Sequence, residues 1–406
     1  MKSTMKRWAW MTMLLIGTIS TSITSCNDGE GDTNPGGEEV ETAYVRGLES
    51  YTPNGTIKYL EVTKDLATNP DLSQAVELGQ NVSIHSAGKY PITLSSDSKT
   101  ITKWKVDKTT LEVSVDGILS YASTGATSTN VAFVSETAAF ICDLIEGVFV
   151  EFNPTTMELT KTHNVTPLNI PNNFSAYTVG KLYNGKIIFP IQWGAQTCCD
   201  YPTPVYATVG VFDPSTGALT YDTDDRAIGL TAPIFIDGDN AYVVPANSQN
   251  AWINHYLGAS PNPHIALKLN ADGTFDDSFI SDIEDGLPDA SLIRSSSFVF
   301  QDKYVFLYSE EELTGSFDNR FSARSSMEYK SVAYDLNTHE AELFSFDNKY
   351  NQVYLLATID GVNYFNTFYL VGGEYSSNIL VQNSLEDYSL ISTIEIGGFG
   401  YLGKLW

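Results

Sequence analysis

The segment from Val209 to Asp222, "VGVFDPSTGALTYD", contains the pattern that decides the fold. Two runs rich in β-branched and aromatic residues flank a polar turn that extends from Asp213 to Gly217. Asp and Ser side chains cap such turns, and Pro and Gly suit their backbone angles. The segment therefore predicts a β-hairpin.

The same kind of turn recurs along the chain. Its copies are "EVTKDLATN" near Thr63, "KVDKTTLEV" at Asp107, "EFNPTTMELT" at Asn153, "KLNADGTFDD" at Asn270, "YDLNTHEAELF" at Asp335 and "VQNSLEDYSL" at Asn383. Together with Asp213 they make seven turns, spaced by about 45 to 65 residues, which is the range of propeller blades.

A second hairpin marker precedes six of these turns. It stands in "SAGKYPITL" at Gly88, "VSETAAFIC" near Glu136, "YNGKIIFPI" at Gly185, "IDGDNAYVV" at Gly238, "FQDKYVFLY" at Asp302 and "IDGVNYFNT" at Gly361. No sustained 3.6-residue periodicity lies between the markers, so we expect few helices. The pattern predicts an all-β, seven-bladed β-propeller with four antiparallel strands per blade.

Both ends of the domain are predicted to close the ring within one blade. "GGFGYLGKLW" (residues 397–406) is expected to be the innermost strand of blade one, with "TAYVRGLE" (42–49) and "IKYLEVTK" (57–64) as its next two strands. "SLISTIEI" (389–396) is then the outer strand of blade seven. The alternative architecture is a pair of β-sandwiches.

The first 41 residues indicate export and anchoring. Three basic residues precede the apolar run "AWMTMLLIGTI", which is too short to span a membrane and typical of a secretory signal. "ITSC" (residues 23–26) resembles the bacterial lipobox, in which the cysteine, here Cys26, carries the lipid. The rival interpretation is an ordinary secreted thiol. We expect a lipoprotein signal at 1–25, an acidic flexible tether at 26–41 and the propeller at 42–406.

The charge of the chain restricts its partners. The formal net charge is −26, and residues 27–41 contain six acidic and no basic side chains. No basic stripe exists to neutralise phosphates, which argues against nucleic acid and against anionic lipid headgroups as partners. We therefore expect contact with a membrane only through the lipid anchor.

Three adjacent blades carry a long connection between their second and third strands. From first marker to third-turn marker the chain runs 28, 32 and 33 residues in blades four, five and six, but 19, 17 and 22 in blades two, three and seven. Long connections in compact domains are usually functional or disordered, and these are rich in aromatic residues. We expect them to bind a planar or aromatic ligand through Trp193, Tyr201, Trp252, His255, Tyr256, Phe317, Arg320, Arg324 and Tyr329. The alternative is that these aromatic rings pack the connections onto the propeller.

The remaining cysteines are odd in number. With Cys26 lipidated, an exported chain has three thiols, at Cys142, Cys198 and Cys199, so one must stay unpaired or pair with another molecule. A vicinal Cys198–Cys199 disulfide with Cys142 buried and free is the simplest assignment. A Cys142 bridge to one of the pair and a thiolate metal site stay open as alternatives.

The sequence contains no recognisable catalytic set. The five histidines form no metal-binding motif, and neither a GxSxG elbow, a P-loop nor a dinucleotide fingerprint occurs. Acidic residues of the long connections could form a carboxylate pair or bind calcium, but an acidic chain places carboxylates throughout, and solvated loop charge is the favoured explanation. We therefore expect no enzyme, no cofactor and no metal site.

The lipobox, the acidic tether, the seven degenerate blades and the aromatic connections together resemble the propeller surface lipoproteins of Bacteroidetes. Members of that family capture iron–siderophore complexes and pass them to a TonB-dependent outer-membrane receptor. The resemblance rests on organisation and transfers no binding residue. It implies a cell-surface, outer-membrane lipoprotein that takes part in iron acquisition by binding a ferric catecholate siderophore, with Arg294, Arg320, Arg324 and Lys330 as the local cations.

Three other functions remain compatible with the sequence. A glycan-binding surface lipoprotein would use the Trp and Tyr rings as sugar-stacking platforms and would need no arginine. A propeller lyase or glycosidase would use loop carboxylates. A protein-interaction scaffold would need neither sugar-stacking rings nor catalytic carboxylates. Fold alone does not choose among these functions.

Overall fold

A computed structural model describes residues 39–127, 130–170, 174–195, 206–227, 231–245, 264–288, 292–300, 302–310, 329–344, 352–371, 374–382, 384, 387–395 and 397–406. The chain divides into a first unit, Met1–Glu38, and a second unit, Glu39–Trp406. The described residues all belong to the second unit, so the lipoprotein signal and Cys26 lie outside them. Within these ranges no helix is long and apolar enough to cross a bilayer.

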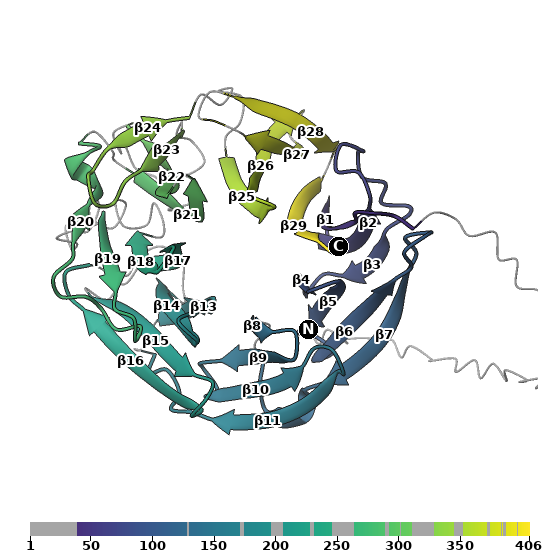
Figure 1. Ribbon diagram of the computed structural model, residues 1–406, viewed down its shortest axis with the longest axis horizontal. Helices are drawn as coiled ribbons and strands as arrows, with labels where there is room; N and C mark the ends of the chain where they lie inside the picture. Colours follow the sequence, from purple (N-terminus) through teal and green to yellow (C-terminus); the bar gives the residue numbers. More distant parts are fainter. Residues whose placement is uncertain are drawn as a thin grey trace, which may run out of the picture. The chain divides into compact units, whose positions relative to one another are not determined.

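The second unit is a seven-bladed β-propeller. Its strands form seven antiparallel sheets, which follow one another around a ring (Figure 1). The only helices in the described ranges are two 3-10 turns, η1 (Ala122–Thr124) and η2 (Ile283–Asp285). The predicted fold class is thus confirmed, and the alternative of two β-sandwiches is wrong, because the strands form seven separate sheets that follow one another around a ring (Figure 1).

Blades 1 to 4 are given from the innermost strand outward. Blade 1 contains β29 (Gly397–Lys404), β1 (Tyr44–Thr52), β2 (Gly55–Thr63) and β3 (Val76–Gly79). Blade 2 contains β4 (Val82–Ala87), β5 (Tyr90–Ser95), β6 (Thr100–Val106) and β7 (Val113–Ser120). Blade 3 contains β8 (Val131–Ser135), β9 (Ala138–Asp143), β10 (Val148–Asn153) and β11 (Glu158–Asn164). Blade 4 has its inner strand in two pieces, β12 (Phe174–Thr178) and β13 (Lys181–Tyr183), followed by β14 (Lys186–Ala195), β15 (Ala207–Asp213) and β16 (Ala218–Asp224).

Blades 5 to 7 repeat this order. Blade 5 contains β17 (Thr231–Asp237), β18 (Asn240–Pro245), β19 (Ile265–Leu269) and β20 (Ser281–Asp282). Blade 6 contains β21 (Leu292–Phe300), β22 (Lys303–Ser309), β23 (Lys330–Tyr334) and β24 (Ala341–Leu343). Blade 7 contains β25 (Gln352–Ile359), β26 (Val362–Val371), β27 (Glu374–Gln382) and β28 (Tyr388–Ile394).

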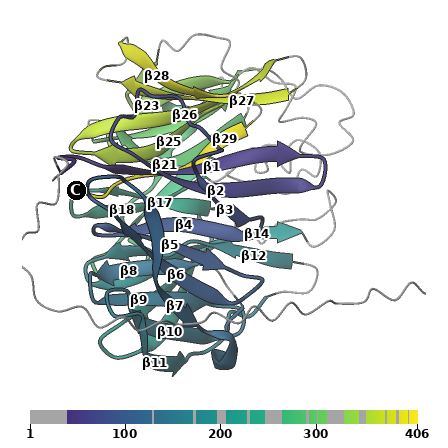
Figure 2. The same cartoon turned by 90° about the vertical axis from the view of Figure 1, so that its right-hand side faces the viewer.

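The ring closes in blade 1, as predicted. The last strand, β29, pairs with β1 from Tyr44 opposite Lys404 to Ser50 opposite Gly397, and both views show the two strands side by side (Figure 1, Figure 2). Arg46 of β1 is 1 % exposed and links blade 1 to its neighbour. Its guanidinium donates to Glu61 Oε2 at 2.6 Å, to Thr68 O at 2.7 Å and to Ser392 Oγ of blade 7 at 3.4 Å. These bonds satisfy the buried charge and join the two blades that meet at the closure.

The repeated turn has a local physical cause. Asp213 Oδ1 accepts hydrogen bonds from the Ser215 backbone N–H and hydroxyl at 2.8 and 2.6 Å, and the Gly217 N–H donates to Asp213 O at 2.8 Å. Gly217 has φ +74°, and the residues four positions after Asp107, Asn153 and Asp335 also have positive φ. The carboxylate or amide closes the turn, and one left-handed residue turns the chain into the next strand.

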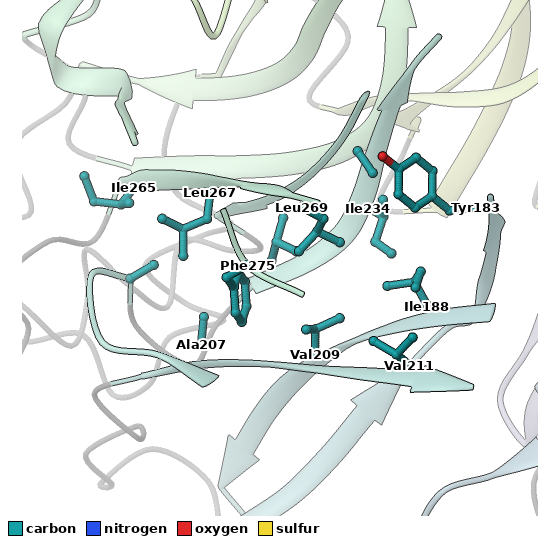
Figure 3. Close-up of a cluster of buried hydrophobic side chains, with 13 residues drawn as sticks. Tyr183, Ile188, Ala207, Val209, Val211, Ile234, Ile265, Leu267, Leu269 and Phe275 are labelled. Atoms are coloured by element: carbon teal, nitrogen blue, oxygen red, sulfur yellow. The ribbon is translucent and has the colours of Figure 1, made fainter. Parts of the chain in front are cut away.

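Apolar side chains fill the space between neighbouring blades. Blades 4 and 5 meet in a cluster that includes Ile188, Val209, Ile234 and Leu267, and Figure 3 shows these side chains pointing toward one another from both blades. A middle strand has a neighbouring blade on each face, so both sets of alternating side chains become buried. This packing holds the blades in register.

The strand ends define two faces of the propeller. First and third turns lie at one end of the strands, which we call the terminal face, because Glu39 and Trp406 also lie there. The Val40 N–H donates to Lys108 O at 2.9 Å in a third turn, and Trp406 Nε1 donates to Val40 O at 2.8 Å. Second turns lie at the opposite end, the loop face.

Candidate functional site

The three long connections start and end on the loop face of consecutive blades. They join β14 to β15, β18 to β19 and β22 to β23, each the second and third strand of its blade. Most residues predicted to bind ligand lie outside the described residues, namely Tyr201, Trp252, His255, Tyr256, Phe317, Arg320 and Arg324. Cys198 and Cys199 also lie outside them, as does the side chain of Arg294. Trp193 and Tyr329 can be placed.

Trp193 lies in the core of the propeller. It is 2 % exposed and packs in a cluster with Phe189, Ile191 and Phe212. Its indole Nε1 is buried and has no hydrogen-bond partner among the residues that the structure describes. This position gives the ring a packing role, which was the alternative weighed for the aromatic residues. Contact between Trp193 and a ligand stays a prediction.

The base of the third connection carries a small polar network. Lys330 Nζ donates to Glu310 Oε2 at 2.6 Å, and the Tyr308 hydroxyl donates to Glu310 Oε1 at 3.0 Å. The hydrogen bond from Lys330, followed by that from Tyr308, lowers the pKa of the Glu310 carboxyl. Lys330, one of the predicted local cations, is thus ion-paired, and the half-buried Tyr329 stands directly before it.

His264 ends the second connection and pairs with an exposed carboxylate. It is 4 % exposed, and its Nδ1 lies 2.8 Å from Glu284 Oε1. The hydrogen bond with His264 lowers the pKa of Glu284. When Nδ1 donates this bond, Nε2 carries the lone pair and can accept a proton or a hydrogen bond. Nε2 has no partner within the described ranges, where no group of three metal-ligating side chains occurs either.

Sequence analysis missed a group of buried polar side chains between blades 6 and 7. Because Phe365, Leu380, Val305 and Ala333 pack together there, alternation places the polar residues nearer the loop face on the same two surfaces. They are Ser309, Ser331, Thr367, Ser376 and Asn378, each less than one-tenth exposed. These five side chains carry hydroxyl and amide groups and no charge, and buried Leu307 lies opposite Ser331 on the same face, so the layer suits uncharged hydrogen-bonding partners. No turn marker or aromatic pattern in the sequence signals it.

Two of the cavities lined by described residues lie away from the loop face. A groove of about 810 Å³ runs along the outer strands of blades 1 and 2, with Val62, Val76 and Val113 among its lining residues. A pocket of about 470 Å³ lies on the terminal face where blades 1, 2 and 3 meet. Its residues appear nowhere among the predicted binding residues.

Cys142 occupies the position expected for the unpaired thiol. It is 1 % exposed, forms no disulfide, and lies in the cluster between blades 3 and 4. Burial raises the pKa of its thiol well above the usual value. The alternative bridge between Cys142 and one of the paired cysteines is therefore absent from this structure, while the Cys198–Cys199 disulfide stays a prediction.

No family model matches the chain, and no curated protein matches it in sequence. Among solved structures, it is similar to a candidate 6-phosphogluconolactonase from Bacteroides fragilis, with 12 % identity, a TM-score of 0.50, and coverage of 93 % of this chain and 99 % of that chain. It is also similar to the periplasmic gluconolactonase PpgL of Pseudomonas aeruginosa (9 % identity, TM-score 0.47, coverage 89 % and 99 %) and to apo AztD of Citrobacter koseri (8 %, 0.40, 89 % and 99 %). Identities this low show the propeller fold alone.

The expectation that this chain is not an enzyme is wrong, because it excluded an enzymatic activity. It rested on the absence of catalytic motifs, yet a protein named as a candidate 6-phosphogluconolactonase shares this fold. A catalytic set is recognised by the geometry and the roles of its residues and not by their position in the sequence. The missing motifs therefore give no ground for excluding an activity.

Proposed function

We propose that this protein is a lipid-anchored, cell-surface protein of the outer membrane that captures a ferric catecholate siderophore complex and passes it to a TonB-dependent receptor. The observation that carries the proposal is the concentration of the long connections on the loop face of blades 4, 5 and 6. Binding residues of a rigid scaffold are disproportionately placed on such connections.

The position of Glu39 supports a binding site on the loop face. Glu39 and Val40 contact Lys108 on the terminal face, so a chain anchored through Cys26 is attached to the propeller at that face. The connections then belong to the face that lies away from the attachment point. That arrangement suits a protein that captures its ligand from outside the cell.

The chemistry of the connections supports an anionic, aromatic ligand. Trp252, Tyr256 and Phe317 offer ring faces, and Arg320 and Arg324 offer guanidinium groups that can stack on catechol rings and neutralise their charge. Lys330 is already paired with Glu310, which leaves the two arginines to balance the ligand's charge against an acidic chain.

A binding titration tests the ligand. Ferric tricatecholate should quench the tryptophan fluorescence of the purified protein saturably. Arg320→Ala and Arg324→Ala should each weaken binding by about 1–3 kcal/mol, because each removes a charge-assisted contact. Lys161→Ala, an exposed change on the outer strand of blade 3, is the matched control and should bind as the unaltered protein does. Saturable binding of neutral glycans without any response to ferric catecholates would favour the glycan-binding alternative instead.

The anchor requires a separate test. Cys26→Ser should move the protein from the membrane fraction to the soluble fraction, because the lipid would be its only hold on the bilayer. Surface exposure is then checked by protease treatment of intact cells, with a periplasmic protein as the control. An unchanged membrane pool of the Cys26→Ser protein would contradict lipid anchoring, and protection from protease would contradict surface display.

A further inference from the structure

The pocket on the terminal face is a built site that the proposed function does not use. Three blades contribute to its wall: Lys404, Leu405 and Trp406 from blade 1, residues 87–90 of the first turn of blade 2, and Glu136 and Thr155 from two turns of blade 3. Its volume of about 470 Å³ lies in the range of small-molecule sites.

Trp406 supplies a fixed aromatic wall. Its indole Nε1 donates to Val40 O at 2.8 Å, and its backbone carbonyl accepts from the Ala43 N–H at 3.2 Å. The neighbouring Leu405 N–H donates to Ala43 O at 2.9 Å, and Leu405 is 5 % exposed beneath the pocket. A ring held by these bonds loses little freedom when a ligand packs against it.

Two opposite charges line the same pocket without ion-pair partners in the described part of the chain. Lys89 Nζ lies 5.3 Å from the centre of the Tyr90 ring, and Lys89 forms no ion pair there. Glu136 stands beside the first turn of blade 2, close enough that a side chain on Gly88 would meet its carboxylate at 3.3 Å. The Thr155 hydroxyl donates to the Glu136 carbonyl at 2.7 Å and fixes this turn.

The other lysines near the pocket are already neutralised. Lys404 Nζ lies 2.6 Å from Asp360 Oδ2, and Lys103 Nζ lies 2.7 Å from Asp116 Oδ2. Among the residues that the structure describes, the pocket therefore presents an ammonium and a carboxylate without ion-pair partners, Lys89 and Glu136, beside an aromatic wall. A purely anionic ligand would use only Lys89 and would be repelled by a chain of net charge −26. A neutral sugar would leave both charges unused.

We propose that this pocket binds a zwitterionic α-amino acid with an apolar or aromatic side chain. Lys89 takes the ligand carboxylate, Glu136 takes its ammonium group, and the side chain packs against Trp406 and Leu405. A zwitterion carries no net charge, so the acidic chain does not oppose its approach. The proposal does not rest on the siderophore function, because the pocket lies on the terminal face and the long connections start and end on the loop face.

Calorimetric titration of the full chain with L-phenylalanine tests this site. We expect saturable one-to-one binding of L-phenylalanine. N-acetyl-L-phenylalanine and L-phenylalaninamide each lack one of the two charges and should bind at least about tenfold more weakly. Lys89→Met and Glu136→Gln should each weaken phenylalanine binding at least about tenfold. Both side chains are exposed, so the variants should melt as the unaltered protein does. Lys161→Met and Glu146→Gln, exposed changes on blade 3, are the matched controls and should leave binding unchanged.

Several results would overturn the proposal. These are the absence of saturable phenylalanine binding, equal binding of the acetylated or amidated analogue, and unchanged binding in Lys89→Met or Glu136→Gln. Saturable binding of glucose with the same affinity as phenylalanine would also overturn it, since that ligand needs neither charge. Failure of the siderophore titration leaves this test unaffected, because its readout comes from a different face.

Discussion

The middle strands of blades 5 and 7 occupy equivalent positions in the ring but bury different chemistry. In blade 5, residues 241–245 of β18 and residues 265–267 of β19 are buried and apolar. In blade 7, five buried residues of the neighbouring strands β26 and β27 are polar, namely Asn366, Thr367, Ser376, Ser377 and Asn378, and Thr367 lies opposite Asn378. Burial in the ring therefore does not require an apolar side chain when hydrogen bonds are available.

The difference shows how each blade is stabilised. Apolar side chains in blade 5 gain free energy from every contact with blades 4 and 6, whatever the detailed geometry. The polar side chains of blade 7 contribute only when their partners are in place. Asn366 Nδ2 donates to Phe399 O of blade 1 at 2.7 Å, and the Thr393 hydroxyl donates to Asn378 Oδ1 at 2.7 Å. Blade 7 should thus tolerate substitution less predictably than blade 5.

The largest expected effect comes from the apolar side of the comparison. Leu267→Ala removes a side chain that is 0 % exposed between blades 4 and 5. It should lower the free energy of unfolding by about 2–5 kcal/mol, because the lost burial and the remaining cavity both destabilise the fold. Urea unfolding measures the change. A loss below about 1 kcal/mol would mean that this interface relaxes into the cavity and is not close-packed.

A smaller loss is expected in the polar interior of blade 7. Asn366→Ala removes the donor to Phe399 O and the acceptor of the Ser377 hydroxyl, and leaves both groups buried. The expected loss is about 2 kcal/mol, since unsatisfied buried groups keep their desolvation cost. Asn164→Ala on the exposed edge of blade 3 is the control and should change stability little. A loss as small as the control's would show that these hydrogen bonds do not stabilise blade 7.

Thr367→Val should have an effect of opposite sign. Thr367 is 0 % exposed, and its hydroxyl has no partner among the described residues. Replacing that hydroxyl by a methyl group of similar size should raise the free energy of unfolding by about 1 kcal/mol, because no hydrogen bond is lost. The same urea experiment applies. A decrease would indicate that a bound water or another group satisfies the hydroxyl and that the polar layer is fully paired.

The smallest effect is expected at the exposed Asp213 turn, which lies outside the buried strands of blades 5 and 7 and serves as the reference for both. Hydrogen bonds from the Ser215 hydroxyl and backbone lower the pKa of Asp213. The folded state then binds a proton less readily than the unfolded state, so this stabilisation is present above the unfolded pKa and is lost as the pH falls through the folded one. Asp213→Asn should flatten the acid limb of the stability curve by less than about 1 kcal/mol. An identical pH profile would mean that the exposed turn carries no measurable linkage.

The turns at Asp107 and Asp213 were predictable because each depends on neighbouring residues. Asp107 and Asp213 close their turns with backbone N–H groups two or three positions ahead, so the signal is local and survives in the sequence. The closure in blade 1 was predictable for a different reason. Once the strands were counted, the last strand had only one incomplete sheet to join, and the β29–β1 register shows it there.

The candidate site was less accessible from sequence. Aromatic content drew attention to Trp193, but the structure places that ring in the core between blades 3 and 4. Conversely, Lys89, Glu136 and Trp406 are far apart in the chain and carry no common motif, although they line one pocket. Residue type indicates what a side chain can do, while its neighbours decide whether it faces a ligand or the interior.

The sequence by itself determined the strands, the turns, the number of blades and the strand that closes the ring, because hairpins depend on side chains within a few residues of each other. Only the tertiary structure decided which residues meet across blade boundaries. "EYSSNILVQ" (residues 374–382) reads as a partly solvated strand, yet Ser376, Ser377 and Asn378 are buried because blade 7 has a neighbour on each face. The physical reason is that burial and pocket formation depend on contacts between segments far apart in the sequence, which local patterns do not encode.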